Sequence, residues 1–468
     1  MPQTPNILLL MTDQQRHDSL GYSRQGEATD TPHLDALAAG GVIFEHAYSS
    51  DTACIPARSS LLTGLLPHRV PRGGGDRPRA KTASGLALTE GYWTLAHALR
   101  DAGYDTALFG KMHFSPIRAQ HGFDTMAMCE HLPAGYPRDE ADDYRRWINA
   151  TGREDVRFQR PGMPRVFPYA QEYHPTHWIT HHARQFLDAP ARRSKPWFAV
   201  VSYTDPHTPY SPPEPYASRH HAADQVLPQS GMESNNGLPW PFSNITVRHP
   251  RGTFFEPDRV DHHPAEHLPN VLAAIRAGIN HVDDKIGELL AGVDLSNTLV
   301  IFLSDHGDYG GHRGFLGKIP WLPFDDIARV PFFMAGAGVS GGRRVTAPVQ
   351  SFDYVATVLD LVGLPGPCSD LDSRSLLRVL AGGEQPAERP VFCGTLEGFP
   401  MLRRGRYKHI WHTVANVHIL YDLEADPGEA HNLADQPRYR ALLEANVQEL
   451  SAMLARPVPP LWRQPAAG

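Results

Sequence analysis

Four short polar segments carry residue types that can bind a metal ion or an anion. They are Asp13-Gln14, Lys111-Met112-His113, Asp205-Pro206-His207 and Asp305-His306, and each closely follows a run of apolar residues. The oxygen ligands of Asp13, Gln14 and Asp305 suit a hard cation such as Ca²⁺. His306 adds a borderline nitrogen ligand, which leaves Mn²⁺ open as well. A capping aspartate or a surface histidine would explain any one segment, but the four together favour a common site.

A fifth segment, Cys54-Ile55-Pro56-Ala57-Arg58, combines a nucleophile with an anion-binding side chain. Pro56 suits the first position of a helix and Gly64 its end, so we expect Cys54 at a helix N-terminus. The unpaired N–H groups there favour an anion, and Arg58 can clamp it with its planar guanidinium. An idle thiol of low pKa is the alternative. The remaining cysteines show no CxxC spacing, so we expect buried apolar fillers: Cys129, Cys368 and Cys393.

The elements that must position these residues alternate between strand and helix patterns. Apolar runs at 6–11, 106–110, 197–203 and 298–304 predict buried strands, and helical patterns at 94–101 and 271–290 lie between them. A further helix is expected after Thr31-Pro32, with Thr31 as its cap and Gly40-Gly41 at its end. Such alternation predicts an α/β fold with a mostly parallel central sheet and helices on both faces. Ligands bind beyond the carboxyl ends of the strands in such sheets, where the polar segments would meet.

The rest of the chain divides into loops and a second domain. Stretches at about 129–176 and 205–266 lack periodicity and are rich in Pro, His, Tyr and Trp, which is typical of binding loops or of surface excursions. Strand patterns at 401–404 and 407–411 precede an amphipathic helix at 438–454. We therefore expect a catalytic domain over 1–382 and a small α+β domain over 383–468.

Composition narrows the function classes. Of the 468 residues, 41% are hydrophobic and 20% charged, which is too apolar for a disordered chain. A net charge of −7 without a basic stripe argues against nucleic acid as a partner. Nothing resembles a membrane span, and the first apolar run is too short for a signal-peptide core, so a cytoplasmic protein without a membrane partner is expected.

The segment from Cys54 resembles the C/S-x-P-x-R signature, followed by L-T-G, of the sulfatases of the alkaline-phosphatase-like superfamily. The resemblance spans nearly the whole chain. Other matching segments are Thr31 to Ala38 (TPNLDxLA), Gly110 to His113 (G-K-x-H), Asp305 to Gly307, Arg329 to Pro331, and the C-terminal Tyr421-Asp422-Leu423, Asp426-Pro427 and Asn432-Leu433.

The resemblance implies a sulfuric-ester hydrolase acting on a small sulfated substrate. A formylglycine-generating enzyme would oxidise Cys54 to formylglycine, whose hydrated aldehyde is the nucleophile and which joins the metal ligands. One divalent metal is implied, with Ca²⁺ preferred to Mn²⁺. Arg58, Lys111 and Lys318 would hold the sulfate. His207, partnered by Lys318, would protonate the departing alcohol, and His113 would take the proton of the second hydroxyl. A homo-oligomer stays open.

Departures from the family pattern keep alternatives open. Asp13-Gln14 stands where many relatives have two aspartates, and Ala57 where Ser is commoner; these features, with His121-Gly122-Phe123, are similar to the choline-sulfatase branch. Phosphonate monoester hydrolases share the Asp-Gln pair but differ at Lys-x-His, so a phosphonate or phosphodiester hydrolase is the first alternative. A catalytically silent metal-binding homologue is the second. His207 could instead cap a loop, and Gln14 could only support the ligands.

Overall fold

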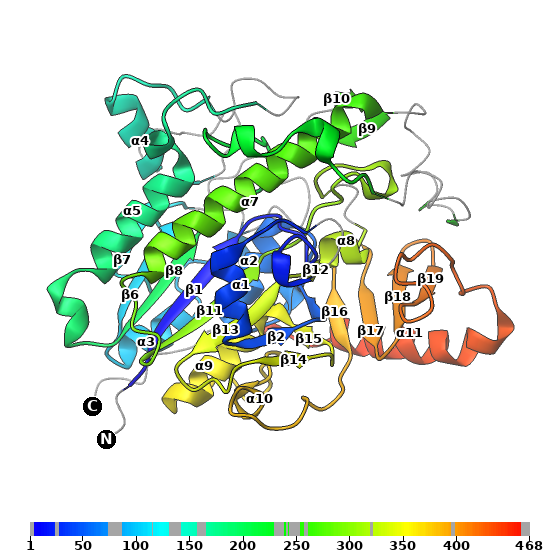
Figure 1. The fold of residues 1–468 in the computed structure, drawn as a ribbon. Helices are drawn as coiled ribbons and strands as arrows, with labels where there is room; N and C mark the ends of the chain where they lie inside the picture. Colours follow the sequence, from blue (N-terminus) through cyan, green and yellow to red (C-terminus); the bar gives the residue numbers. More distant parts are fainter. Residues whose placement is uncertain are drawn as a thin grey trace.

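A computed structural model describes residues 4–23, 28–73, 87–114, 116–130, 142–156, 165–228, 238–239, 242, 253–256, 261–318, 322–394 and 398–459. Its centre is a sheet with the strand order β14-β2-β13-β11-β1-β8-β6-β7 (Figure 1). The strands are β1 (Asn6–Thr12), β2 (Val42–Phe44), β6 (Asp105–Gly110), β7 (Thr125–Met128), β8 (Trp197–Ser202), β11 (Thr298–Ser304), β13 (Phe332–Gly336) and β14 (Arg343–Val345). Only β13 runs antiparallel to its two neighbours, so the sheet is mixed but mostly parallel.

Helices cover both faces of this sheet because its strands are apolar on both sides. Alternate residues of β1 enter different cores: Leu9 faces one core, and Leu8 faces the other. The first core is closed by α2 (Cys54–Thr63), α3 (Leu95–Asp101) and α9 (Tyr354–Val362), and the second by α1 (Pro32–Ala39), α5 (Pro175–Leu187) and α7 (Leu268–Leu290). In Figure 1, α5 and α7 lie side by side across the sheet. The expected α/β architecture is therefore confirmed.

The strands that precede the polar segments are the four adjacent parallel strands β11, β1, β8 and β6. Thr12 pairs with Ser304, and Ser202 pairs with both Met11 and Gly110, so all four strands end at the same level. Their carboxyl ends thus form one edge, as the sequence predicts, and α2 begins over that edge.

The start of α1 lies where the sequence predicts it, but its capping contact differs. Thr31 makes no capping hydrogen bond; its hydroxyl donates to Asp35 Oδ1 at 2.9 Å. The helix N–H groups of His33 and Leu34 donate instead to the carboxylate of Asp283, at 3.2 and 2.8 Å. Thr31 occupies the N-cap position with Pro32 in the first turn, as predicted, but a charged acceptor on α7, 250 residues further along the chain, takes the N–H groups.

The C-terminal part forms a second, antiparallel sheet, seen at the right of Figure 1. Its strands are β16 (Val391–Cys393), β17 (Met401–Arg404), β18 (Tyr407–His412) and β19 (Val417–Asp422), followed by α11 (Arg440–Leu454). The predicted small α+β unit is confirmed, while its boundary at 382/383 stays a prediction. Lys408 of β18 is fully buried, and its Nζ lies 2.7 Å from carboxylate oxygens of both Asp325 and Glu429. The pair with Asp325 joins this sheet to α8 (Asp325–Ala328).

Short elements complete the described chain. They are β3 (Ala47–Tyr48), β12 (Arg329–Val330) and β15 (Val349–Gln350) in one small sheet, the ladders β4 (Arg72–Gly73) with β5 (Ala87–Leu88) and β9 (Thr253–Glu256) with β10 (Asp261–Pro264), and the helices α4 (Asp143–Ala150), α8 (Asp325–Ala328) and α10 (Leu377–Leu380). Much of the two aperiodic stretches lies outside the described residues. All four cysteines are free thiols, and of the three expected to be fillers Cys129 and Cys393 are buried and Cys368 is partly exposed.

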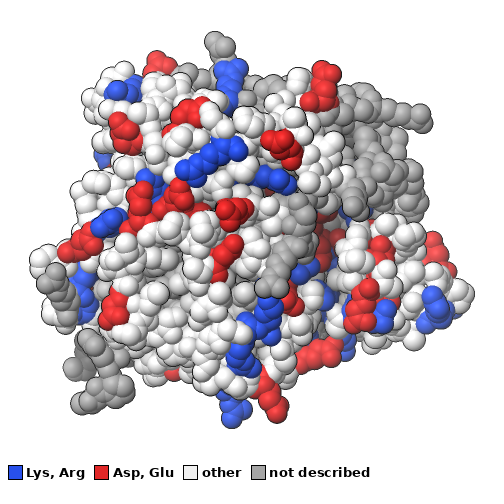
Figure 2. Space-filling view, in the orientation of Figure 1, with Lys and Arg blue, Asp and Glu red and all other residues white. Residues whose placement is uncertain are grey.

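Charges of both signs are interspersed on the face of the molecule shown in Figure 2. Among the described helices, none is long and apolar enough to span a bilayer.

Candidate active site

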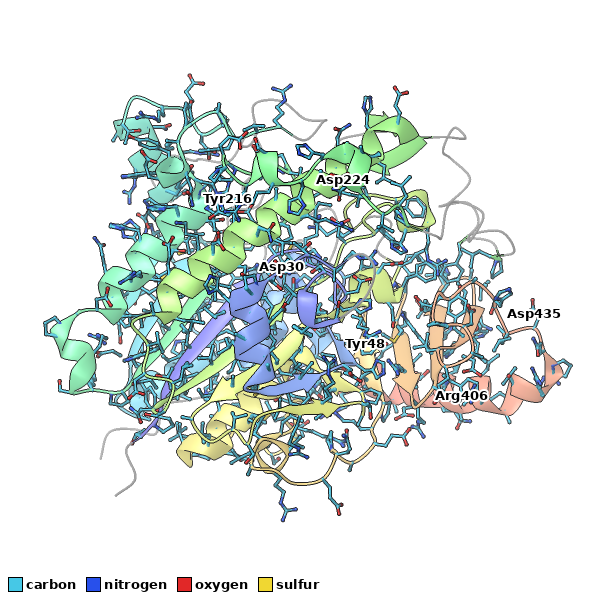
Figure 3. All side chains as sticks on the ribbon, in the orientation of Figure 1. Asp30, Tyr48, Tyr216, Asp224, Arg406 and Asp435 are labelled. Carbon is cyan, nitrogen blue, oxygen red and sulfur yellow. The ribbon has the colours of Figure 1, made fainter. Side chains whose placement is uncertain are left out.

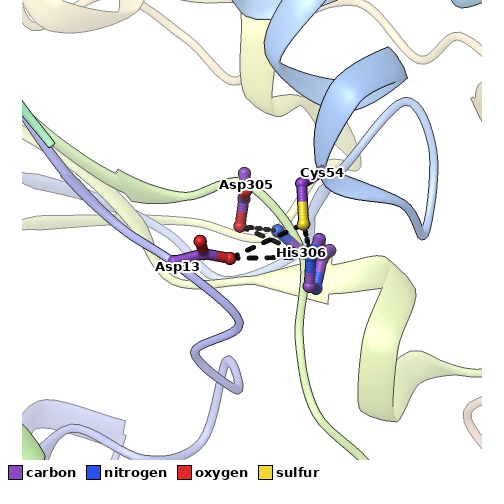
Figure 4. Close-up of side chains that lie close together, drawn as sticks. All are labelled: Asp13, Cys54, Asp305 and His306. Carbon is purple, nitrogen blue, oxygen red and sulfur yellow. Dashed lines mark hydrogen bonds and ion pairs between the residues drawn. The ribbon is translucent and has the colours of Figure 1, made fainter. Parts of the chain in front are cut away.

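Four side chains converge at the carboxyl edge of the sheet: Asp13, Cys54, Asp305 and His306 (Figure 4). One ligand atom from each lies within 4.8 Å of the others, and all four residues are buried. His306 Nδ1 lies 2.9 Å from the carbonyl oxygen of Gly307, which keeps the ring proton on Nδ1. Nε2 is the ring nitrogen that faces the cluster, 3.1 Å from Cys54 Sγ. Two carboxylates, an imidazole and a sulfur in this arrangement form a candidate metal-binding cluster.

The sulfur of Cys54 lies in a positive environment. Lys318 Nζ donates to Sγ at 3.0 Å. Burial alone would raise the pKa of this thiol, but the charges of Lys111, Lys318 and His306 and a hydrogen bond from His113 lower it well below its usual value. The position at the start of α2 adds N–H groups without helical partners. This environment stabilises a negative charge at the Cys54 side chain.

Arg58 and Lys111 hold the carboxylates of the cluster. Lys111 Nζ forms an ion pair with Asp13. Arg58 Nε donates to Asp305 Oδ2 at 2.8 Å, and its Nη1 donates to the carbonyl of Lys111 at 2.7 Å and to Ser202 Oγ at 2.9 Å. Burial would raise the pKa of Asp13, but Lys111, together with His207 and Arg58, outweighs it and holds that pKa below the usual range. The structure thus shows Arg58 in contact with the carboxylates of Asp13 and Asp305. Its role in binding sulfate stays a prediction.

His207 and Lys318 form a second pair beside Cys54. His207 Nδ1 lies 2.7 Å from the carbonyl oxygen of Thr208, so the ring proton is held on Nδ1. Nε2 accepts a hydrogen bond from Lys318 Nζ at 2.8 Å. Since the same ammonium also reaches Cys54, Lys318 bridges the imidazole and the sulfur.

Gln14 and His113 share a left-handed backbone conformation, with φ of 65° and 69°, which is uncommon outside glycine and clusters at functional sites. Gln14 N donates to Asp305 Oδ1 at 3.1 Å, and Gln14 Nε2 donates to Asp308 Oδ2 at 2.7 Å. Asp308 also accepts from Tyr210 Oη at 2.9 Å. Gln14 is therefore fixed at the edge of the cluster, and its role as a ligand stays a prediction.

Glu130 supports the site and was missed from the sequence. Its Oε1 accepts hydrogen bonds from the backbone N–H groups of Met112 and His113, at 2.9 and 2.8 Å. The side chain is fully buried, and burial raises its pKa despite these bonds. Glu130 closely follows β7, so it could have been found as another acidic residue after a strand, had the pattern of β7 been recognised.

A family model described as Sulfatase matches residues 5–364 of the chain. This chain belongs to the sulfatase family. Curated relatives include an arylsulfatase of Clostridium perfringens, 28% identical over 94% of this chain and 92% of its own length. A choline-sulfatase of Rhizobium meliloti is 30% identical over 93% of this chain and 83% of its own length. The sulfatase described here therefore hydrolyses sulfate esters.

Solved structures agree on the fold. A phosphonate monoester hydrolase of Agrobacterium radiobacter superposes with a TM-score of 0.77 at 24% identity, covering 96% of this sulfatase and 95% of that chain. A sulfatase of Bacteroides thetaiotaomicron, described as putative, reaches a TM-score of 0.72 at 23% identity, covering 97% and 93%. At these identities the likeness shows the shared alkaline-phosphatase-like fold and nothing further.

Proposed function

We propose that this sulfatase cleaves sulfate monoesters with a nucleophile made from Cys54 beside a divalent metal ion. The observation that carries the proposal is the position of Cys54 Sγ, which lies among the atoms of Asp13, Asp305 and His306 and accepts from Lys318 at 3.0 Å. A nucleophile placed there would face both a metal ion and a cation able to bind sulfate.

The donor set fits a hard divalent cation. Asp13 and Asp305 supply carboxylate oxygens, His306 supplies its Nε2, and Gln14 would add its amide oxygen. We propose Ca²⁺, because most of these ligands are oxygens, with Mn²⁺ as the alternative because of the imidazole. When bound, the ion would supply Lewis-acid chemistry, offsetting charge on the sulfate and activating the attacking hydroxyl.

We further propose that Cys54 is converted to formylglycine by a formylglycine-generating enzyme. The support is the C-x-P-x-R segment together with its position at the start of α2. The hydrated aldehyde would supply the attacking hydroxyl group. The positive surroundings that lower the pKa of the Cys54 thiol would equally favour an ionised oxygen at this position.

The cations around Cys54 are placed to hold the sulfate. Lys318 Nζ contacts Cys54 Sγ, and the buried Lys111 forms an ion pair with Asp13 of the same cluster. Arg58 lies behind both carboxylates, with Nη2 3.6 Å from Asp13 Oδ2. Charges fixed in a buried site stabilise the negative charge that develops on the ester without reorganising water.

Proton transfer falls to the two histidines. His207 Nε2, 2.8 Å from Lys318 Nζ, is placed to carry the proton that the departing alcohol requires. His113, whose backbone is held by Glu130, contributes a hydrogen bond to the Cys54 side chain and is placed to take a proton from a hydroxyl there.

The alternative is hydrolysis of phosphonate monoesters or phosphodiesters. It is favoured by Asp13-Gln14 and by a relative named multifunctional alkaline phosphatase superfamily protein PehA, from Trinickia caryophylli, which is 28% identical over 95% of this chain. Parallel assays of matured enzyme on aryl, choline and sugar sulfates and on an aryl phosphonate test both. We expect kcat/KM to be highest on one of the sulfates. A higher kcat/KM on the phosphonate than on every sulfate would overturn the proposal.

A further inference from the structure

Three potential metal ligands converge outside the catalytic cluster. His174 lies at the start of α5, Asp205 follows β8, and His281 lies within α7. One ligand atom of each lies within 4.8 Å of the others. The Nδ1 of His174 is 3.8 Å from Asp205 Oδ2, and the rings of His174 and His281 are 4.8 Å apart between centroids. We propose that these three residues bind a second metal ion, a divalent transition metal.

His281 provides an independent observation. Its side chain is fully buried, and neither ring nitrogen has a hydrogen-bond partner. A neutral imidazole carries one N–H donor and one lone pair, and buried polar atoms of this kind are nearly always paired with protein, water or an ion. Burial and neighbouring positive groups keep the pKa of His281 well below its usual value, so the ring is neutral and able to bind a metal.

The surroundings leave negative charge available for an ion. The cations that lie near His281 are paired elsewhere: Lys285 lies 2.6 Å from Glu288, and Arg219 lies 3.4 Å from Asp284. The ring of Tyr216, labelled in Figure 3, also packs on the His281 ring, at 4.7 Å between centroids. Its hydroxyl donates to Asp284, so the tyrosine offers the His281 ring no hydrogen bond. Within the described residues, Asp205 is the carboxylate that completes the group with the two histidines.

The ligand types indicate the class of metal. Two imidazoles with one carboxylate suit Zn²⁺, Co²⁺ or Fe²⁺ better than Ca²⁺, which prefers oxygen ligands. In the structure His174 Nδ1 accepts from the N–H of Thr176 at 3.2 Å, and a bound ion would take over this lone pair. The ion would join α5, α7 and the segment after β8. Its ligand in that segment, Asp205, lies two residues before His207.

His121 shows why the orphaned nitrogens alone do not define the site. It too is buried with both ring nitrogens unpartnered, but its ring packs 5.2 Å from that of Phe114. It belongs to none of the potential metal-binding groups among the described residues. His121 is therefore a matched control: a buried histidine of the same kind that belongs to no group of three potential metal ligands among the described residues.

The test removes the catalytic ligands first. Full-length Asp305→Ala/His306→Ala protein is stripped with chelator, loaded with Zn²⁺ or Co²⁺ and freed of excess ion. Elemental analysis should find one ion per chain, and Co²⁺ should give visible d–d absorption. Adding His281→Phe should abolish both signals, while adding His121→Asn should leave both unchanged.

His281→Phe could lose metal simply because it fails to fold, so a second variant is needed. Asp205→Asn keeps the shape of the side chain and should weaken Co²⁺ binding by at least about tenfold. Circular dichroism shows whether each variant is folded. Absence of bound metal in the parent double variant would overturn the proposal. Undiminished binding in folded His281→Phe or Asp205→Asn protein would overturn it equally. Neither outcome bears on the catalytic cluster, which the background variant lacks.

Discussion

Lys318 Nζ donates to His207 Nε2 across 2.8 Å. The other ring nitrogen of His207 is held by the carbonyl of Thr208, so the ring has one orientation and one nitrogen available for proton transfer. Because the same lysine contacts Cys54, the imidazole is held beside the Cys54 side chain. This relationship supports the proposed role of His207 as the acid for the departing alcohol.

His207→Ala should therefore harm esters with poor leaving groups most. General acid catalysis contributes roughly 10²–10⁴-fold, so alkyl sulfates should lose about that factor in kcat/KM, while esters of acidic phenols should lose about tenfold or less. The plot of log kcat/KM against leaving-group pKa should steepen. His113→Ala is the comparison, and we expect it to slow kcat of all esters towards one rate. Equal slopes for wild type and His207→Ala would transfer the acid role to Lys318.

Maturation should depend on Cys54. Peptide mass spectrometry after co-expression with a formylglycine-generating enzyme should show Cys54 converted. Cys54→Ala should abolish sulfate release with little effect on thermal unfolding, because it removes one small side chain at a helix start. The control Cys368→Ala changes a partly exposed thiol that is not part of the cluster and should retain activity. Full activity with an unmodified Cys54 thiol would contradict the prediction.

Loss of the catalytic ion should stop turnover. Asp305 links Arg58 and Gln14 to the cluster, so Asp305→Ala should remove a ligand and loosen its neighbours. We expect chelation to inactivate the enzyme, and the variant to hold one ion fewer by elemental analysis. Reactivation of chelated wild type by Ca²⁺ or by Mn²⁺ separates the two metals. Asp294 lies on the surface, so the control Asp294→Ala should change neither the metal content nor the activity. An Asp305→Ala protein that kept both its metal and its activity would show that the metal site is misplaced.

Glu130 should position His113 rather than react. Glu130→Ala leaves two backbone N–H groups without their acceptor, which should lower the free energy of unfolding by about 1–3 kcal/mol. Because His113 would lose its fixed backbone, kcat should fall by the same factor for good and poor leaving groups. Glu130→Gln keeps an acceptor oxygen and should lose less of both. An unchanged kcat in Glu130→Ala would refute the positioning role. Glu172 is exposed, and Glu172→Ala serves as the control, which should change neither kcat nor stability.

Stability should fall in mild acid because several histidines are buried. Burial lowers the pKa of His17, His46 and His409 to about 3 and that of His121 to about 4. Below pH 6.5 these imidazoles bind protons in the unfolded chain but stay neutral in the folded protein. The free energy of unfolding is therefore full above pH 6.5 and falls as the pH drops towards 3 to 4. Each ring contributes up to about 1.4 kcal/mol per pH unit.

Denaturant titrations at a series of pH values measure this slope. His409→Leu should make it shallower than in wild type, because His409 is fully buried. His431→Leu changes a side chain that is 82% exposed and should leave the slope unaltered. If His409→Leu and wild type lost stability equally between pH 6.5 and 4.5, the buried neutral state of His409 would be wrong.

Much of this architecture was readable in the sequence because its signals are local. A continuous apolar run marks β1 or β11 whatever its partner, and a polar residue that ends such a run is delivered to the carboxyl edge of a parallel sheet. The end of α2 at Gly64 was predicted in the same way, since Gly64 adopts the left-handed conformation that ends helices. Its start was predicted two residues late, because α2 begins at Cys54 and Pro56 is its third residue. The predicted ligands Asp13, Asp305 and His306 consequently meet.

Only the tertiary structure decided which distant groups complete the site. Strands as short as β2 and β14 carry too few residues to show a period, so the mixed edge of the sheet was not predicted. Glu130 beneath His113 and Asp283 at the start of α1 accept backbone hydrogen bonds, for which any well-placed acceptor serves. The approach of His281 to Asp205 likewise depends on how α7 packs across the sheet. Contacts of this kind produce no recognisable pattern in the sequence, because the packing of the folded core alone brings the two partners together.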